Sequence, residues 1–444
     1  MTMPGSSGVE LARTALNSER RVLVVSYYYP PFTSAGAIRV SKMTKYLGEY
    51  GWTPTVLTVT RDDRPMGMDV EIPPKAIRRV PQLVDVVGLP KRLAGSRNYQ
   101  RPAAGVGATG TSGILWRLAV AYRHVACFPD PQVGWLVPAV REGFRLIDEI
   151  RPHVIFSSSF PNTSHLVAAW LSHRTGIPWI AELRDPWTDN HNFRRVAPLR
   201  ALEQRLERAV FRQASALVTV SEVWAEALKR RFGKPTYVVS NGYDPLDYPD
   251  EAPEGDLFSL VYMGTFYNGK QKPDALFAAV AALKGAGTIA PATFQLRFRG
   301  QFLQPLFDAA RLAGILPFVT VEGPVSYRES LRLQRNATAL LFFDWSDGHE
   351  KGCYSAKIYE YLGARRPILS VGPHDSVVAD LIAQTGAGEV VETPEEVRLV
   401  LERWIHQHRT ATLLCETDPA SLKPYQRQAA AAAMADILNR HAQI

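Results

Sequence analysis

The sequence predicts an α/β protein of two doubly wound, parallel-sheet domains in tandem. The 444 residues, 46% of them hydrophobic, suffice for two domains of roughly 200 residues, each with its own core. Short apolar strands alternate with amphipathic helices, the order typical of parallel sheets. An acidic, Pro-containing stretch at residues 241–256 separates two such series and has the composition of a linker.

The first series opens with a strand at residues 21–27 (RVLVVSY), a helix at 38–50 and a strand at 55–60. This order predicts a right-handed crossover. The loop before the helix holds Gly36, which leaves backbone free to approach a ligand, but it lacks a G-x-G-x-x-G dinucleotide fingerprint. The series continues with strands at 154–158, 179–183, 216–220 and 236–240 and with helices that end at 150 or span 163–174, 198–213 and 221–232.

A long segment interrupts this series. Residues 61–112 are rich in Pro, Gly and Arg without periodicity, so we expect an exposed insertion, flexible at about 92–112, and a disordered start at 1–19. Residues 114–128 predict an amphipathic helix that carries aromatic and basic side chains. Such a helix lies in a membrane interface or packs on its own domain, and the sequence leaves both readings open.

The second series begins after the linker. The predicted domains are residues 1–240 and 257–420, and an Ala-rich helix within 421–444 is free to pack back on the first domain. The expected strands are 258–263, 293–299, 319–322, 337–343, 368–371 and 389–391, and the expected helices are 274–284, 306–314, 327–335, 394–408 and 424–441, with one more beginning at Ser355.

Charge is distributed unevenly. Residues 1–240 hold 32 Lys and Arg against 19 Asp and Glu (+13), whereas the rest hold 19 against 24 (−5). This excess predicts an anionic partner for the first domain, either a phospholipid surface or a phosphorylated acceptor, with scattered solubilising charge as the alternative. Nucleic acid is not expected, because no binding module is recognised.

Cysteine usage and hydropathy bear on the compartment. Cys127, Cys353 and Cys415 show no C-x-x-C spacing, so neither disulfides nor a zinc site are expected. No apolar run approaches the roughly 18 to 20 residues of a membrane span. We therefore expect a cytoplasmic protein, at most peripheral at the inner face of the cell membrane.

One stretch, SAKIYEYLGARRPILSVG at residues 355–372, carries the clearest functional signal. Ser355 is a good N-cap, Gly363 and Pro367 predict the end of the helix, and an apolar strand follows. A helix N-terminus suits a diphosphate, and Glu360, one turn on, can reach sugar hydroxyls. An ordinary helix–strand unit is the alternative.

The chain resembles the retaining glycosyltransferases of sequence family 4, especially the bacterial branch that builds surface polysaccharides. The resemblance covers about residues 21–438 and rests on ordered motifs: SYYYPPFTSAGAIR, FPD…W, SSSFPNTSH, AELRDPWTDN, VTVSE, VSNGYD, VYMGTFYNGKQK, FRG and SAKIYEYLGARRPIL. It implies the GT-B architecture, two Rossmann-like domains that face each other across a cleft.

The resemblance places the nucleotide-sugar donor mainly in the second domain. Gly264 and its loop match a G-R…K motif whose basic pair neutralises the diphosphate; Thr265 stands where Arg is usual, and Lys270 or Lys272 fills the Lys role. The residues implied around the donor are Gly36, Gly264, Thr265, Lys270, Lys272, Arg299, Gly300, Ser355, Ala356, Lys357 and Glu360, with Tyr327 as a weaker candidate.

The family signature has two glutamates separated by seven residues. Glu360 matches the second, which binds the ribose, but Gly352 occupies the place of the first, which lies near the sugar. Glu350 is our preferred substitute; His349, Asp347 or backbone N–H groups are the alternatives.

The AELRDPW stretch resembles the acceptor side of the family's site. Arg184 and Asp185 leave the strand where the family places a polar residue beside the anomeric carbon. Asp185 is expected to orient the acceptor hydroxyl; an Asp that caps the next turn is the alternative. Asp185, Glu350 and Lys270 are the candidate catalytic residues.

The resemblance, together with these features, implies a retaining transfer of a sugar, from a UDP-sugar, to a saccharide or lipid-diphosphate-linked acceptor in polysaccharide synthesis. No convincing D-x-D pair is found, so we expect neither a metal nor another cofactor, with protein cations stabilising the leaving diphosphate. The alternatives are a non-catalytic nucleotide-sugar-binding scaffold, a transferase with a soluble small-molecule acceptor, and a GT-B epimerase or phosphorylase.

Overall fold

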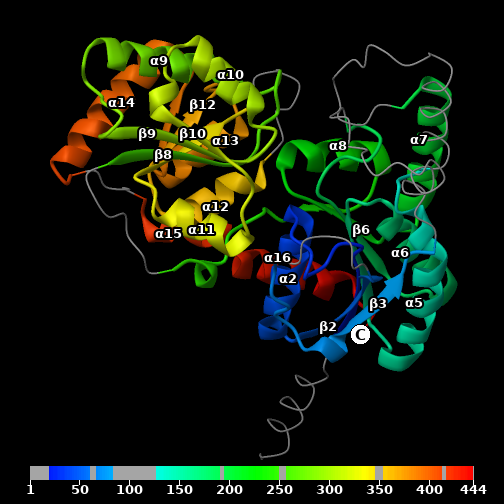
Figure 1. Ribbon diagram of the computed structural model, residues 1–444. Helices are drawn as coiled ribbons and strands as arrows, with labels where there is room; N and C mark the ends of the chain where they lie inside the picture. Colours follow the sequence, from blue (N-terminus) through cyan, green and yellow to red (C-terminus); the bar gives the residue numbers. More distant parts are fainter. Residues whose placement is uncertain are drawn as a thin grey trace, which may run out of the picture. The chain divides into compact units, whose positions relative to one another are not determined.

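The computed structural model describes residues 20–60, 67–83, 127–190, 195–249, 257–345, 354–412 and 417–443. The chain forms two compact units (Figure 1). The first contains residues 1–220, 224–239 and 431–444, and the second contains 221–223 and 240–430. The change at residue 240 lies beside the predicted linker.

The first unit is built on a parallel sheet of seven strands among the described residues, in the order β3-β2-β1-β4-β5-β6-β7. The apolar runs that predicted the central strands are largely buried; Leu23 and Ile155, for example, are fully inaccessible. The strands are β1 (Arg20–Val25), β2 (Trp52–Thr60), β3 (Ile77–Pro81), β4 (Val154–Ser159), β5 (Trp179–Leu183), β6 (Ala216–Thr219) and β7 (Thr236–Val238), and the helices are α2 (Ala35–Leu47), α5 (Leu136–Ile150), α6 (Thr163–Thr175), α7 (Ala197–Phe211) and α8 (Glu222–Phe232).

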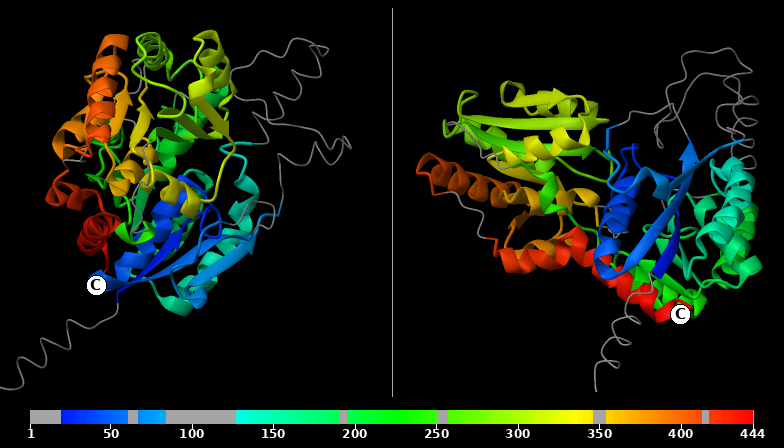
Figure 2. Two further views of the ribbon diagram at one scale, coloured as in Figure 1. Left: turned by 60° about the vertical axis from the view of Figure 1, so that its left-hand side comes forward. Right: turned by 90° about the horizontal axis from the view of Figure 1, so that it is seen from below.

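The C-terminal helix α16 (Arg427–His441) returns to the first unit from Ala431 onward. Its Met434 and Leu438 are buried, and the Trp52 indole N–H donates to Asn439 Oδ1 at 3.0 Å. Figure 2 shows this helix alongside the N-terminal elements of the first sheet.

The second unit has a parallel sheet of six strands among the described residues, in the order β10-β9-β8-β11-β12-β13. One cluster of apolar side chains packs α9, α10 and α14 on one face, and a second cluster packs α12 and α13 on the other (Figure 1). The strands are β8 (Phe258–Thr265), β9 (Phe294–Gln301), β10 (Val319–Glu322), β11 (Ala339–Phe343), β12 (Ile368–Val371) and β13 (Gly388–Val391), and the helices are α9 (Asp274–Gly285), α10 (Gln304–Leu312), α11 (Tyr327–Arg335), α12 (Ala356–Ala364), α13 (Val377–Thr385), α14 (Pro394–Arg409) and α15 (Pro419–Leu422).

The predicted fold class, two Rossmann-like domains with doubly wound parallel sheets, is confirmed. The interpretation of residues 61–112 as an exposed insertion is wrong for 77–81, which form the edge strand β3, paired with β2. Helix α13 was not predicted. The regions expected at 1–19 and 92–112, and all but the last two residues of the helix expected at 114–128, lie outside the described residues.

Within the described part of the chain, no helix has the length and apolar character needed to cross a bilayer.

Candidate functional site

Each sheet has a point at which the strand order reverses. This point lies between β1 and β4 in the first sheet and between β8 and β11 in the second. Open α/β sheets bind ligands outside the carboxyl ends of their strands at such points. The residues that follow these four strands are therefore the first to consider.

Two predicted donor-site glycines lie opposite each other at the carboxyl ends of β8 and β9. Gly264 pairs with Gly300 in the ladder, and their φ angles are 121° and 146°. A Cβ on Gly300 would lie 1.9 Å from the carbonyl oxygen of Gly264. The close approach therefore requires glycine at Gly300 and leaves bare backbone at the edge of the sheet.

Replacing Gly300 with alanine is expected to lower the free energy of unfolding by more than about 1 kcal/mol. The new Cβ would collide with the backbone of Gly264, and alanine would have to adopt a positive φ. Urea denaturation measures the effect. Gly285→Ala is the matched control, since it lies at the end of α9 with open space around it. Equal stability of the two variants would contradict this reading of Gly300.

Lys357 lies in the first turn of α12 and reaches back to the end of β8. Its Cδ is 3.0 Å from where a Cβ on Gly264 would stand. Its Nζ donates to the Tyr262 hydroxyl at 2.7 Å and to the Thr265 carbonyl oxygen at 3.3 Å, and it lies 4.2 Å from the centroid of the Tyr262 ring. The structure thus brings together the predicted residues Gly264, Thr265 and Lys357.

The Lys357 ammonium is electrostatically unusual. Burial lowers the pKa of Lys357 from 10.5 to about 7, although the Glu360 carboxylate opposes this shift. A bound anion stabilises the charged form of such a partly buried lysine more than it stabilises that of an exposed lysine. Such an environment is typical of a functional site.

Glu360 is held on α12 by neighbours from other elements. Its Oε2 accepts from the Gln334 amide at 3.2 Å, and its carbonyl oxygen accepts from the Tyr248 hydroxyl at 2.7 Å. Burial raises the pKa of Glu360, while Gln334, Arg427 and Lys357 oppose the shift. Its assignment to a ribose stays a prediction.

The start of α12 differs in detail from expectation. Ser355 occupies the N-cap position, but its side chain makes no capping hydrogen bond to the N–H groups of the first turn. The helix ends at Ala364, between Gly363 and Pro367 as predicted. Arg365 rather than Gly363 adopts the left-handed conformation at its end, with a φ of 52°.

Gly363 has a packing role instead. A Cβ there would lie within 2.6 Å of ring atoms of Tyr243 and Tyr248. The glycine lets these two aromatic side chains approach the helix.

The remaining predicted donor-site side chains, three cations and Tyr327, have different surroundings. Lys270 Nζ stands 4.9 Å from the centroid of the Trp345 ring, at the end of β11, whereas Lys272 is exposed. Arg299 forms an ion pair with Glu322 on the neighbouring strand β10. The Tyr327 hydroxyl donates to Asp247 at 3.2 Å. Lys270 thus lies over a residue that follows β11, one of the strands that flank the reversal point.

In the first unit, Arg184 follows β5 and reaches the start of α2. Its guanidinium nitrogens lie 2.4 and 2.5 Å from where a Cβ on Gly36 would stand, so this glycine makes room for Arg184. Its Nε donates to the Ser159 carbonyl oxygen and its Nη2 to that of Phe160 at 3.3 Å. The side chain of Asp185 is exposed beside it.

Two acidic residues of the first-unit motifs are structural. Glu182 is fully buried and accepts from Arg39 at 2.8 Å and from the Ser158 hydroxyl at 2.6 Å. Asp130, from the FPD motif, accepts from the Thr163 N–H and hydroxyl, both at 2.7 Å, at the start of α6. Both carboxylates fix elements next to the reversal point.

Sequence reasoning missed three neighbours of the second reversal point. Tyr262 positions Lys357, Trp345 lies under Lys270, and Asp344, which directly follows β11, is a residue only 4% exposed. The available signal for Asp344 and Trp345 was an acid and an aromatic residue directly after the apolar run ALLFF. Glu350, its alternatives Asp347 and His349, and Gly352 lie outside the described residues.

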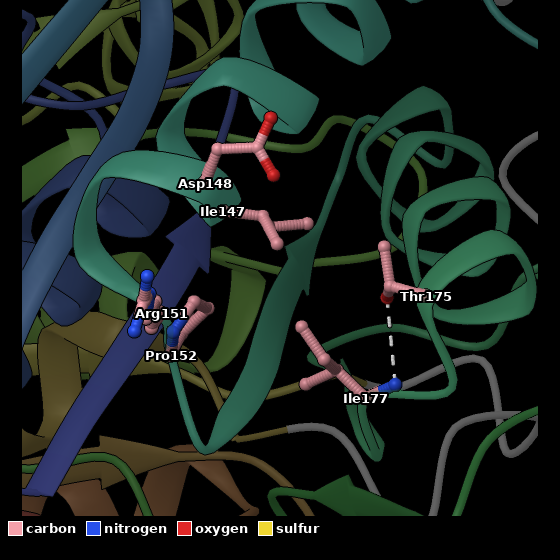
Figure 3. Close-up of a pocket in the computed structure, with 6 residues that line it drawn as sticks. All are labelled: Ile147, Asp148, Arg151, Pro152, Thr175 and Ile177. Carbon is pink, nitrogen blue, oxygen red and sulfur yellow. Dashed lines mark hydrogen bonds between the residues drawn. The ribbon is translucent and has the colours of Figure 1, made fainter.

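A hollow of about 560 Å³ lies elsewhere on the first unit (Figure 3). It is formed at the C-terminal ends of α5 and α6 by Ile147, Asp148, Arg151, Pro152, Thr175 and Ile177. Since these helices run against the strands, the hollow lies at the amino edge of the sheet, away from the reversal point. No predicted site residue lines it.

Comparisons with known proteins agree with the fold. Residues 34–242 match the model of the glycosyl transferase 4-like domain. No curated protein matches the chain. Among solved structures, a sucrose-phosphate synthase from Thermosynechococcus elongatus is 14% identical, with a TM-score of 0.60, over 95% of this chain and 98% of that chain.

Two further structures are similar. HepE from Anabaena, solved in complex with UDP and glucose, is 12% identical with a TM-score of 0.60, over 95% of this chain and all of that chain. WaaG, a glycosyltransferase involved in lipopolysaccharide biosynthesis, is 13% identical with a TM-score of 0.52, over 94% and 99%. The first domain thus matches the glycosyl transferase 4-like family model, and the chain has the fold class of the GT-B glycosyltransferases.

Proposed function

We propose that this protein is a retaining glycosyltransferase that moves a sugar from a UDP-sugar to a saccharide or lipid-linked saccharide acceptor. The observation that carries the proposal is the arrangement at the second reversal point. There a lysine whose pKa burial lowers to about 7 lies against the bare backbone of Gly264, beside the start of α12, where the Ser355 side chain makes no capping hydrogen bond. The Lys357 ammonium and the N–H groups at the start of α12 both bind negative charge, and a diphosphate supplies it.

The similar structures support a uridine nucleotide as the donor. HepE was solved with UDP and with UDP-glucose, and Staphylococcus aureus MnaA was solved with UDP. In our proposal Glu360 binds the ribose, and Lys357, Lys270 and the first-turn N–H groups of α12 bind the diphosphate.

The first domain is assigned to the acceptor. Its net charge of +13 suits a phosphorylated or lipid-diphosphate-linked saccharide, and peripheral binding to an anionic membrane is part of this proposal. Arg184 and Asp185 lie at the carboxyl end of β5. We assign them to the acceptor hydroxyl.

In the proposed reaction, the bond from the anomeric carbon to the diphosphate oxygen breaks as negative charge builds on UDP. The lysines and the helix N–H groups stabilise that charge. The acceptor oxygen attacks from the same face, its proton passes to a donor phosphate oxygen, and the new glycosidic bond retains the configuration. Metal independence is part of the proposal, with the leaving group neutralised by protein cations.

The test is a screen of purified protein with isotope-labelled UDP-sugars, supplied with saccharides or with bacterial membrane extract. We expect one labelled sugar to be transferred, with its anomeric configuration kept in the product. If UDP binds but no sugar is transferred or hydrolysed, the non-catalytic nucleotide-sugar-binding scaffold replaces this proposal.

A further inference from the structure

Asp344 is a buried acid at the point where ligands bind in this class of sheet. It directly follows β11, one of the two strands that flank the reversal of the second sheet. Its residue exposure is 4%. The other flanking strand, β8, ends in Gly264 and Thr265, against which Lys357 packs.

One oxygen of this carboxylate lacks a hydrogen-bond partner among the described residues. Oδ1 accepts from the N–H of Trp345 at 2.8 Å, whereas the buried Oδ2 has no donor there. Burial raises the pKa of Asp344, and the Trp345 N–H and the nearby Ser376 hydroxyl oppose the shift, but the Ser376 hydroxyl makes no hydrogen bond to Oδ2. An unmet buried carboxylate oxygen is costly, and a ligand hydroxyl would satisfy it.

The surroundings keep this carboxylate in place. A Cβ on Gly372, at the end of β12, would lie 2.7 Å from the Asp344 Cβ, so glycine provides the room for the acid. The Gln271 amide donates to the Phe343 carbonyl oxygen at 2.7 Å and its Oε1 accepts from the Tyr267 N–H at 3.0 Å. Gln271 thereby ties the turn that bears Lys270 to the end of β11.

We propose that Asp344 accepts a hydrogen bond from a hydroxyl group of the donor's sugar and thereby selects and positions that sugar. This inference rests on the proposed function. It assigns to a strand-end acid the contact that sequence reasoning sought in the loop residue Glu350. The nucleotide is held by other groups, so Asp344 should act on the sugar alone.

The test compares UDP with UDP-sugars by calorimetry on the full-length protein. The probes are UDP, UDP-glucose, UDP-galactose and UDP-N-acetylglucosamine, and the quantity is the ratio of the Kd for UDP to the Kd for the tightest UDP-sugar. We expect Asp344→Asn to lower this ratio by about 10- to 100-fold, the loss of one charge-assisted hydrogen bond, and to leave the Kd for UDP unchanged.

Asp380→Asn is the matched control, because Asp380 is an exposed acid in the first turn of the adjacent helix α13. It should alter neither Kd. Gly372→Ala is a second variant that keeps the carboxylate but displaces it, and it should lower the same ratio at least threefold. It carries the test if Asp344→Asn does not fold.

Three results would overturn the inference. Asp344→Asn could weaken UDP and the UDP-sugar equally, as a purely structural residue would. It could change neither, or the wild-type protein could bind every UDP-sugar no more tightly than UDP. Failure of UDP itself to bind would instead remove the proposed function, and the inference with it.

Discussion

Replacing Lys357 with methionine is expected to weaken UDP binding by about 10- to 100-fold at pH 7, the contribution of a charge-assisted hydrogen bond to a diphosphate. Methionine keeps most of the apolar stem that packs against Gly264 and removes only the ammonium. Calorimetric titration with UDP measures the effect. Lys284→Met is the control, because this exposed lysine lies at the end of α9 and donates to the Gly314 carbonyl oxygen.

The same residue predicts how UDP binding depends on pH. In the free protein the pKa of Lys357 is about 7, and a bound diphosphate raises it. Below pH 7 the ammonium is already formed, so the Kd for UDP should be constant with respect to this group. Above pH 7 binding must take up a proton, so the Kd should rise by up to about tenfold per pH unit until the pKa of the complex is reached.

The groups that face Lys357 do not change the direction of this pH dependence. The Tyr262 hydroxyl and the Thr265 carbonyl oxygen are neutral, and the Glu360 carboxylate favours the charged ammonium. Lys357→Met should therefore flatten the profile measured from pH 6.5 to 9. A wild-type Kd that does not change over this range would contradict the diphosphate assignment.

Stability gives a separate check on this variant. The pKa of Lys357 is lower in the folded than in the unfolded protein, so burying the ammonium costs stability fully below about pH 7, and the cost fades as the pH rises toward 10.5. Lys357→Met removes that cost. We therefore expect its Tm at pH 7 to be no lower than that of the wild type, so that weaker binding cannot be explained by unfolding.

The sequence predicted the sheets well because a central parallel strand is buried on both faces and appears as an apolar run. Strand β3 breaks that rule. It is an edge strand with the sequence IRRVP, and Val80 is its one buried residue. Its two arginines interrupt any apolar run, so the strand was not predicted. Gly363 was interpreted as a residue that ends the helix, but its lack of a side chain instead lets Tyr243 and Tyr248 pack against the helix.

The candidate site was predictable only where a motif carries it. Lys357 and Glu360 lie in one short helix, so their spacing alone placed them one turn apart. The pairing of Lys357 with Tyr262 joins residues 95 positions apart and depends on α12 packing against β8. Asp344 was missed because the sequence does not show whether an acid directly after an apolar strand is buried or which of its oxygens has a hydrogen-bond partner.

Replacing Asp185 with asparagine is expected to reduce sugar transfer by about 100-fold and to leave the Kd for UDP unchanged. We assign Asp185 to the acceptor hydroxyl, and the loss of an orienting contact displaces the reacting oxygen, which costs a factor of this order. Arg184 beside it is fixed by the carbonyl oxygens of Ser159 and Phe160, so the segment itself should keep its shape. The assay is the transfer of the labelled sugar identified in the UDP-sugar screen.

Asp189→Asn separates this effect from a general loss of negative charge. Asp189 lies four residues further along the same segment, its side chain is 56% exposed, and it pairs with Arg231 at the surface, where an ion pair contributes little to stability. Its variant should retain nearly full transfer. If the two variants lose activity equally, or if Asp185→Asn also weakens UDP binding, then Asp185 does not act on the acceptor, and the alternative that it merely caps the next turn becomes the better reading.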